Sequence, residues 1–204
     1  MIHEHFGLFR DAFALNPDLD FLFLSDAHEE AVAHLVYGLE QNVDIILITG
    51  DIGTGKTLAM HRLVEQVANL YVPVVVGVTT IDFEQFLRLV LLKLGHRDVA
   101  KHGLGELIHL LESDLVETRG RGRKILLIVD EAQNLSPATL ESIRLLGNLA
   151  QPGGQALQLV LIGQLPLTET IDQPHLRQLK QRIGVRYEFG YLTREELESY
   201  IAHR

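Results

Sequence analysis

Residues 50–57 read Gly-Asp-Ile-Gly-Thr-Gly-Lys-Thr, a complete G-x-x-x-x-G-K-T pattern. Residues 43–49 before it form an apolar, β-rich run that predicts a buried strand, and residues 57–70 after it have apolar residues at helical spacing. A strand, a glycine-rich loop and a helix in this order are the setting of a phosphate-binding loop. The pattern therefore predicts a nucleoside triphosphate site, and the competing interpretation is an ordinary glycine-rich turn.

The residue types of this loop suit phosphate chemistry. Three glycines, Gly50, Gly53 and Gly55, permit backbone angles at which successive N–H groups face a phosphate. A helix that starts near Lys56 adds the positive end of its dipole, and the Lys56 ammonium can reach phosphate oxygens. The Thr57 hydroxyl can ligate Mg²⁺.

A second apolar run, residues 125–129, ends in two carboxylates, Asp130 and Glu131. Asp130 is placed to hold Mg²⁺ opposite Thr57, and Glu131 can polarise a water in line with the γ-phosphate. The alternative is that Glu131 merely caps the following turn. The predicted nucleotide-binding residues are Gly50, Asp51, Ile52, Gly53, Thr54, Gly55, Lys56, Thr57, Leu58 and Asp130, with Thr57 and Asp130 as metal ligands.

Further polar residues extend the candidate site. Gln164 follows the apolar run 157–162, where it would contact the γ-phosphate or the attacking water, or else be an ordinary loop glutamine. Four cations gather late in the chain, and in oligomeric ATPases an arginine often reaches the phosphates of a neighbouring subunit. For each single residue of this group the alternative is a solvated basic face. The group consists of Arg177, Lys180, Arg182 and Arg186.

Composition limits the classes of protein. The 204 residues, 47% of them hydrophobic, are enough for one α/β core. The net charge of −9 disfavours a non-specific nucleic-acid binder, although residues 119–124 form a local basic stretch. The absence of cysteine excludes disulfides and thiolate chemistry, and the histidine spacing matches no metal site. No secretory signal or apolar run of roughly 18 residues occurs, so we expect a soluble, cytoplasmic chain.

Strand and helix patterns alternate along the chain. We expect helices over 27–41, 57–70, 82–94, 104–118, 136–150, 165–172, 174–182 and 193–204, and strands over 43–49, 72–78, 125–129, 157–162 and 185–189. Four of the strands are apolar throughout. This favours a five-stranded parallel sheet with helices on both faces.

Taken together, these motifs resemble AAA+ ATPases of the general secretion pathway protein A type. The likeness runs over essentially the whole chain. It rests on Gly50–Thr57, on Asp130-Glu131-Ala132-Gln133-Asn134-Leu135, on Gly163-Gln164, on Leu179-x-x-Arg182-Ile183, on the start His5-Phe6-Gly7-Leu8 and Ser25-x-x-His28, and on the ending Leu192 to Arg204. One departure is Leu165-Pro166-Leu167, where many relatives have Pro-Glu-Leu, in a segment expected to face a partner.

The resemblance implies a P-loop NTPase of the AAA+ type that uses ATP and Mg²⁺. It implies Glu131 as catalytic base, Gln164 as sensor and Arg182 as arginine finger, with Arg177 and Arg186 as the next choices. It also places the segment 23–28 near the adenine. The expected divisions are an N-terminal strap over 1–26, a nucleotide-binding core over 27–191, and the first helix of a helical lid, cut short, over 192–204.

The resemblance also implies what the activity serves. The leading hypothesis is an ATPase of an envelope or secretion system, a nucleotide-dependent homo-oligomer with protein partners, cytoplasmic or membrane-associated through regions outside this chain. The alternative is an ATP-dependent, DNA-binding transposition regulator, which the basic stretch 119–124 favours and the charge of −9 disfavours. A third hypothesis is a nucleotide-binding scaffold with negligible hydrolysis, which the missing part of the lid favours and the Glu131 carboxylate disfavours.

Overall fold

The computed structural model describes residues 25–77, 80–149 and 155–203. The predicted strap, residues 1–26, lies almost wholly outside the described residues. The helices are α2 (Asp26–Glu40), α3 (Lys56–Val67), α4 (Phe83–Leu94), α5 (Leu104–Gly120), α6 (Pro137–Leu146), α7 (Leu165–Ile171), α8 (Arg177–Arg182) and α9 (Arg194–His203), with short 3-10 turns η2 (Val99–Lys101), η3 (Ala132–Asn134) and η4 (Pro174–Leu176).

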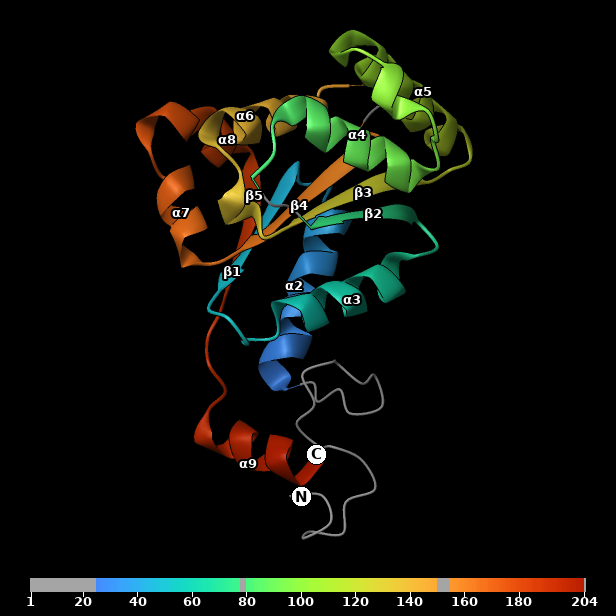
Figure 1. Cartoon of the computed structure of the whole chain (residues 1–204). Helices are drawn as coiled ribbons and strands as arrows, with labels where there is room; N and C mark the ends of the chain where they lie inside the picture. Colours follow the sequence, from blue (N-terminus) through green and yellow to red (C-terminus); the bar gives the residue numbers. More distant parts are fainter. Residues whose placement is uncertain (1–24, 78–79, 150–154, 204) are drawn as a thin grey trace, which may run out of the picture.

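Five parallel strands form one sheet in the order β2-β3-β4-β1-β5 (Figure 1). The strands are β1 (Ile45–Gly50), β2 (Tyr71–Gly77), β3 (Lys124–Asp130), β4 (Leu157–Gly163) and β5 (Ile183–Phe189). The three central strands are buried along almost their whole length, which explains why they read as unbroken apolar runs. The predicted parallel sheet is confirmed.

Helices cover both faces of the sheet (Figure 1). Alternate residues of β1 point to opposite sides, so that Ile46 and Ile48 pack with α2 and α3, whereas Ile45 and Leu47 pack with the layer that contains α4 to α8. The helix α9 stands apart from both layers and has no buried residue. No helix in the described part of the chain combines the length and the hydropathy that a membrane span requires.

Two expectations about the elements need correction. The run 72–78 predicts a buried strand, but β2 is an edge strand in which only Tyr71, Val74 and Val76 are buried. Pro73 explains the position, because proline has no N–H for a second neighbour and is tolerated at an edge. The helix expected to reach about residue 150 ends at Leu146, and the Gly147 N–H bonds back to Arg144.

A buried glutamine joins the sheet to the end of α2. Gln158 of β4 is 1% exposed, and its Nε2 donates to the carbonyls of Leu39 (3.2 Å) and Val43 (3.1 Å). The Tyr71 hydroxyl donates to Gln158 Oε1. The Leu39 carbonyl also accepts a hydrogen bond from the Asn42 N–H (3.1 Å), so Gln158 adds to the helix cap and joins it to β4.

We therefore predict that Gln158→Leu lowers the free energy of unfolding by about 1–3 kcal/mol, because it removes the three hydrogen bonds that this buried amide makes with Leu39, Val43 and Tyr71. The measurement is urea-induced unfolding followed by circular dichroism. Gln66→Leu, an exposed position on α3, is the control. Equal midpoints for the parent and Gln158→Leu would contradict this role.

Candidate functional site

The phosphate loop connects the buried end of β1 to the start of α3. Gly53 and Gly55 have φ values of 81° and 89°, in the left-handed region that glycine adopts without strain. A Cβ at position 55 would lie 1.8 Å from His28 Nε2, so this glycine is required for close packing as well. The Thr54 hydroxyl donates to the Asp51 carbonyl (2.9 Å) and closes the loop on itself.

Lys56 lies under this loop and is only 9% exposed. Its Nζ donates to the carbonyls of Gly50 (2.9 Å) and Asp51 (2.6 Å). Burial lowers the pKa of Lys56, and the nearby carboxylates of Glu131, Asp130 and Asp51 oppose that shift. The loop carbonyls thus hold a cation at the place where an anionic phosphate would need one.

Two carboxylates lie at the end of β3. Asp130 is half-buried, and its Oδ1 accepts a hydrogen bond from the Glu131 N–H (2.9 Å). Burial raises the pKa of Asp130 and the Glu131 carboxylate adds to this, whereas the Glu131 N–H, Lys56 and His61 lower it. Glu131 is exposed and has a left-handed backbone (φ 54°), which turns the chain sharply after the strand.

The ends of three neighbouring strands meet at one cavity of about 320 Å³. The loop after β1, the carboxylates after β3 and Gln164 after β4 all contribute to it. Its lining residues are Ile52, Gly53, Gly55, Lys56, Thr57, Asp130, Glu131 and Gln164. Thr57 and Asp130 both bring oxygen atoms to this cavity, a hydroxyl and a carboxylate. Oxygen atoms are the ligands that Mg²⁺ prefers.

The other predicted loop residues lie around this cavity. Gly50 and Asp51 contribute the carbonyls that bind Lys56. Thr54 and Leu58 line a second cavity, of about 430 Å³, which shares Gly53 and Gly55 with the first. This second cavity is rich in apolar and aromatic side chains and suits a planar base. It is lined by His28, Gly53, Thr54, Gly55, Leu58, Tyr191, Leu192, Leu197 and Tyr200.

Two polar side chains of the second cavity are His28, in the segment that the resemblance places near the adenine, and Tyr191, to which the sequence assigned no role. His28 is 6% exposed, its Nδ1 contacts the Ser25 hydroxyl (2.7 Å), and its Nε2 has no hydrogen-bond partner among the described residues. Burial lowers the pKa of His28. The Tyr191 hydroxyl donates to Asp51 Oδ2 (2.6 Å) across 140 positions of sequence, a contact that no local pattern indicates.

Arg182 does not join the cavity. It is the last residue of α8. The next residue, Ile183, pairs with Ile45 at the start of β1, whereas the phosphate loop follows the end of β1. The two ends are separated by roughly 17 Å of strand. Arg182 Nη1 lies 3.9 Å from Asp44 Oδ2. Within one subunit, the structure therefore keeps this arginine away from Glu131 and Lys56.

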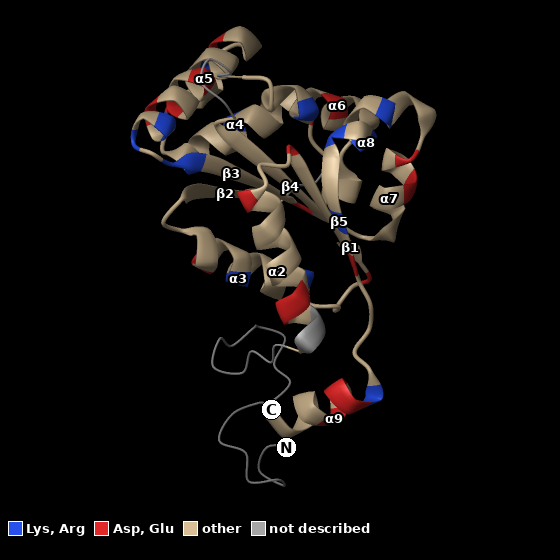
Figure 2. Cartoon of the chain, turned by 180° about the vertical axis from the view of Figure 1, so that it is seen from behind, with Lys and Arg blue, Asp and Glu red and all other residues tan. Residues whose placement is uncertain are grey.

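The other late cations differ in their surroundings. Lys180 (2.9 Å) and Arg186 (3.4 Å) both contact Asp172 Oδ1. Arg177 is exposed at the first residue of α8 and forms no ion pair with another described residue. The ribbon of Figure 2 is coloured for basic residues in α8, for residues of both signs in α6 and for acidic residues around α7.

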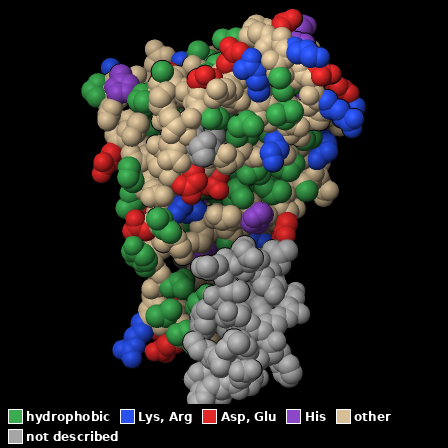
Figure 3. All heavy atoms as spheres, in the orientation of Figure 1, with side chains coloured by type: hydrophobic (Ala, Val, Ile, Leu, Met, Phe, Trp, Pro, Cys, Tyr) green, Lys and Arg blue, Asp and Glu red, His purple; other side chains and the backbone are tan. Residues whose placement is uncertain are grey.

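The basic stretch 119–124 is largely engaged within the protein. Arg121 pairs with Glu117, Arg123 donates to the Ala68 carbonyl (2.7 Å), and Lys124 contacts Asn42. On the face seen in Figure 3, basic side chains are interspersed with acidic ones. This stretch therefore does not form the continuous positive surface that tracks a phosphate backbone.

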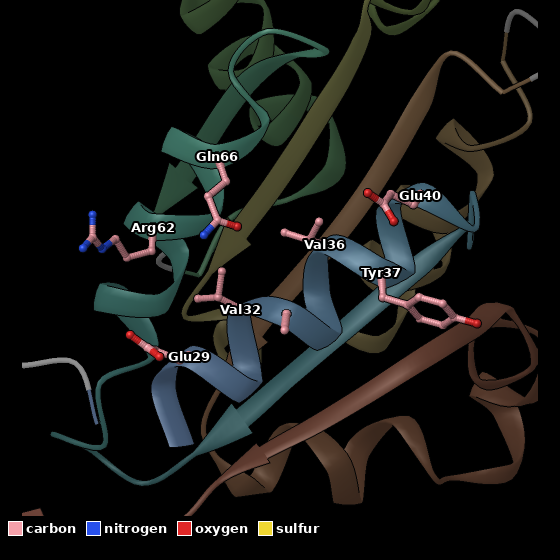
Figure 4. A pocket seen from close by; sticks show the side chains of 8 residues that line it. Glu29, Val32, Val36, Tyr37, Glu40, Arg62 and Gln66 are labelled. Atoms are coloured by element: carbon pink, nitrogen blue, oxygen red, sulfur yellow. The ribbon is translucent and has the colours of Figure 1, made fainter. Parts of the chain in front are cut away.

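A groove of about 560 Å³ lies between α2 and α3 (Figure 4). It is bordered by Glu29, Val32, Ala33, Val36, Tyr37, Glu40, Arg62 and Gln66. None of the phosphate-loop residues lines it. It is larger than the two cavities at the loop, but the cation, hydroxyl and carboxylates that nucleotide chemistry requires line the first of those cavities.

Comparison with known proteins identifies the family. Residues 40–171, more than half of the chain, match the family model described as AAA domain. The chain is 34% identical over all 204 residues to general secretion pathway protein A of Aeromonas hydrophila, of which it spans 37%.

Solved structures share the fold. Cdc6p of Pyrobaculum aerophilum superposes with a TM-score of 0.70 at 18% identity, covering 92% of this chain and 53% of its own. The ORC1 protein of Aeropyrum pernix, solved in complex with DNA, gives 0.66 at 22% identity, covering 95% and 53%. The family and the fold support nucleotide binding, and the chain belongs to the AAA domain family of AAA+ P-loop ATPases.

Proposed function

We propose that this chain binds ATP with Mg²⁺ and hydrolyses its γ-phosphate. The observation that carries the proposal is the convergence of Lys56, Thr57, Asp130, Glu131 and Gln164 on one cavity. Bound Mg²⁺, held by Thr57 and Asp130, would neutralise charge on the phosphate oxygens.

The roles of the side chains follow from their chemistry. Lys56 exchanges its loop carbonyls for phosphate oxygens, and the loop N–H groups bind the same anion. Glu131 accepts a proton from the attacking water, and Gln164 orients that water or the γ-phosphate. The first cavity would take the phosphates and the second the base and ribose.

We further propose that ATP controls self-association, and that the assembled protein acts on protein partners of an envelope or secretion system. The proposal rests on the likeness to general secretion pathway protein A, of which this chain covers only part. The position of Arg182 away from its own cavity supports a role in a neighbouring subunit's site. The proposed divisions are the strap 1–26, the core 27–191 and the start of the lid 192–204.

The first test of this proposal concerns binding. Lys56→Ala should weaken ATP binding by about 2–5 kcal/mol, roughly 30-fold or more in Kd, because it removes a buried cation from the phosphate site. The measurement is titration with a fluorescent ATP analogue. Lys101→Ala, an exposed lysine on η2, is the control. An unchanged Kd for Lys56→Ala would refute the phosphate role.

The second test concerns chemistry. Glu131→Gln should keep ATP binding and lower turnover by about 10²–10⁴-fold, because an amide cannot accept the proton of water. Phosphate release is the measurement, and Glu112→Gln on α5 is the control. If Glu131→Gln turns over like the parent, another group is the base.

The third test concerns assembly. Turnover per subunit should rise with protein concentration, and Arg182→Ala should abolish that rise while dilute protein still binds ATP. Arg97→Ala, an exposed arginine outside the late cation group, is the control. Loss of ATP binding by dilute Arg182→Ala would contradict the finger role, and Arg177→Ala and Arg186→Ala test the next candidates.

The same assay separates the two functional hypotheses. Duplex DNA should leave turnover unchanged over a range of salt concentrations, because the basic stretch 119–124 is paired within the protein. Stimulation by DNA that falls with salt would favour a DNA-binding regulator instead.

A further inference from the structure

Gln133 lies in η3, two residues after Glu131. Both the oxygen and the nitrogen of its carboxamide form hydrogen bonds. Its Oε1 accepts a hydrogen bond from the backbone N–H of Gln164 (3.1 Å). Its Nε2 donates to Glu131 Oε2 (2.5 Å). The Gln164 side chain is a weaker second donor, 3.5 Å from the same Oε2. One side chain therefore connects the proposed base to the end of β4.

The partners fix the orientation of this amide. A backbone N–H can only donate, so the carbonyl of Gln133 must face Gln164, and its NH₂ group must then face the Glu131 carboxylate. A glutamate at position 133 would keep the acceptor but remove the donor and set two carboxylates side by side. Glutamine is the side chain whose two ends match both neighbours.

The surrounding backbone is shaped around the same amide. A Cβ at position 163 would lie 2.7 Å from Gln133 Oε1 and 2.8 Å from Leu167 Cδ2, so Gly163 leaves the space that the carboxamide occupies. Glu131 itself is exposed and has a left-handed backbone. Without Gln133, the Glu131 carboxylate would lose its short hydrogen bond and gain rotamer freedom.

We propose that Gln133 is a positioning residue that orients the Glu131 carboxylate in the cavity. Glu131 and Gln164 line that cavity and Gln133 does not, so Gln133 acts through Glu131 rather than on the nucleotide. Because Gln164 is the N-cap residue of α7, the link also ties the orientation of the base to the start of that helix. The inference rests on the proposed hydrolysis at Glu131.

The test separates positioning from folding. Gln133→Ala should leave the Kd for ATP within about twofold of the parent and lower kcat roughly 10-fold, the effect of losing a hydrogen bond to a charged group. Gln133→Glu should lower kcat further, because it replaces a donor with a like charge. Gln85→Ala, an exposed glutamine on α4, is the control.

Two further variants remove the ambiguity of a single truncation. Gly163→Ala keeps every functional group but displaces the carboxamide, and it should lower kcat while ATP still binds. In a Glu131→Gln background, Gln133→Ala should cause no further loss, because the group that it positions is already absent.

Parent-like kcat in Gln133→Ala would overturn the inference while leaving the proposed function intact. Parallel losses of ATP binding and turnover, both restored by Gln133→Glu, would show a structural link between strand ends and would also overturn it. If the parent hydrolyses no ATP at any protein concentration, the proposed function fails and this inference fails with it.

Discussion

The whole candidate site depends on the parallel direction of the strands. Because every strand of the sheet runs the same way, the carboxyl ends of β1, β3 and β4 meet at one edge, and β4 lies between the other two. The order therefore brings residues 50–57, 130–131 and 164 together although they are far apart in the chain. The apolar packing on both faces holds the strands in this register, so the core fixes the geometry of the polar edge.

Charge at this edge is balanced among groups that are only partly solvated. The Lys56 ammonium is held by backbone carbonyls and has the carboxylates of Asp130 and Glu131 nearby. Burial lowers the pKa of Lys56 and raises that of Asp130, which disfavours the charged form of each side chain. Each charge is therefore stabilised by its oppositely charged neighbour. The phosphates of a nucleotide would add an anionic partner for Lys56, and a divalent cation bound to them would add a cationic partner for Asp130.

The two ends of the sheet carry different groups. The cavity with Lys56 and Glu131 lies at the carboxyl ends of the strands, whereas Arg182 lies at the amino ends beside Asp44. An arginine so far from its own cavity can serve hydrolysis only in another subunit. The chain that joins the two ends passes through α7 and α8, and the N-cap of α7 is Gln164, the residue that Gln133 contacts.

The sequence by itself predicted the elements of the fold and the groups that line the cavity. The apolar runs predicted a five-stranded parallel sheet, and residues 50–57, 130–131 and 164 predicted the groups that line the cavity, because short-range patterns encode strand, loop and helix. Only the tertiary structure decided which groups touch. The edge position of β2, the Tyr191–Asp51 bond, the burial of His28 against Gly55 and the two-ended contact of Gln133 depend on strand order and on loops brought together in space. No local pattern carries that information, because these contacts join segments that only the folded sheet makes neighbours.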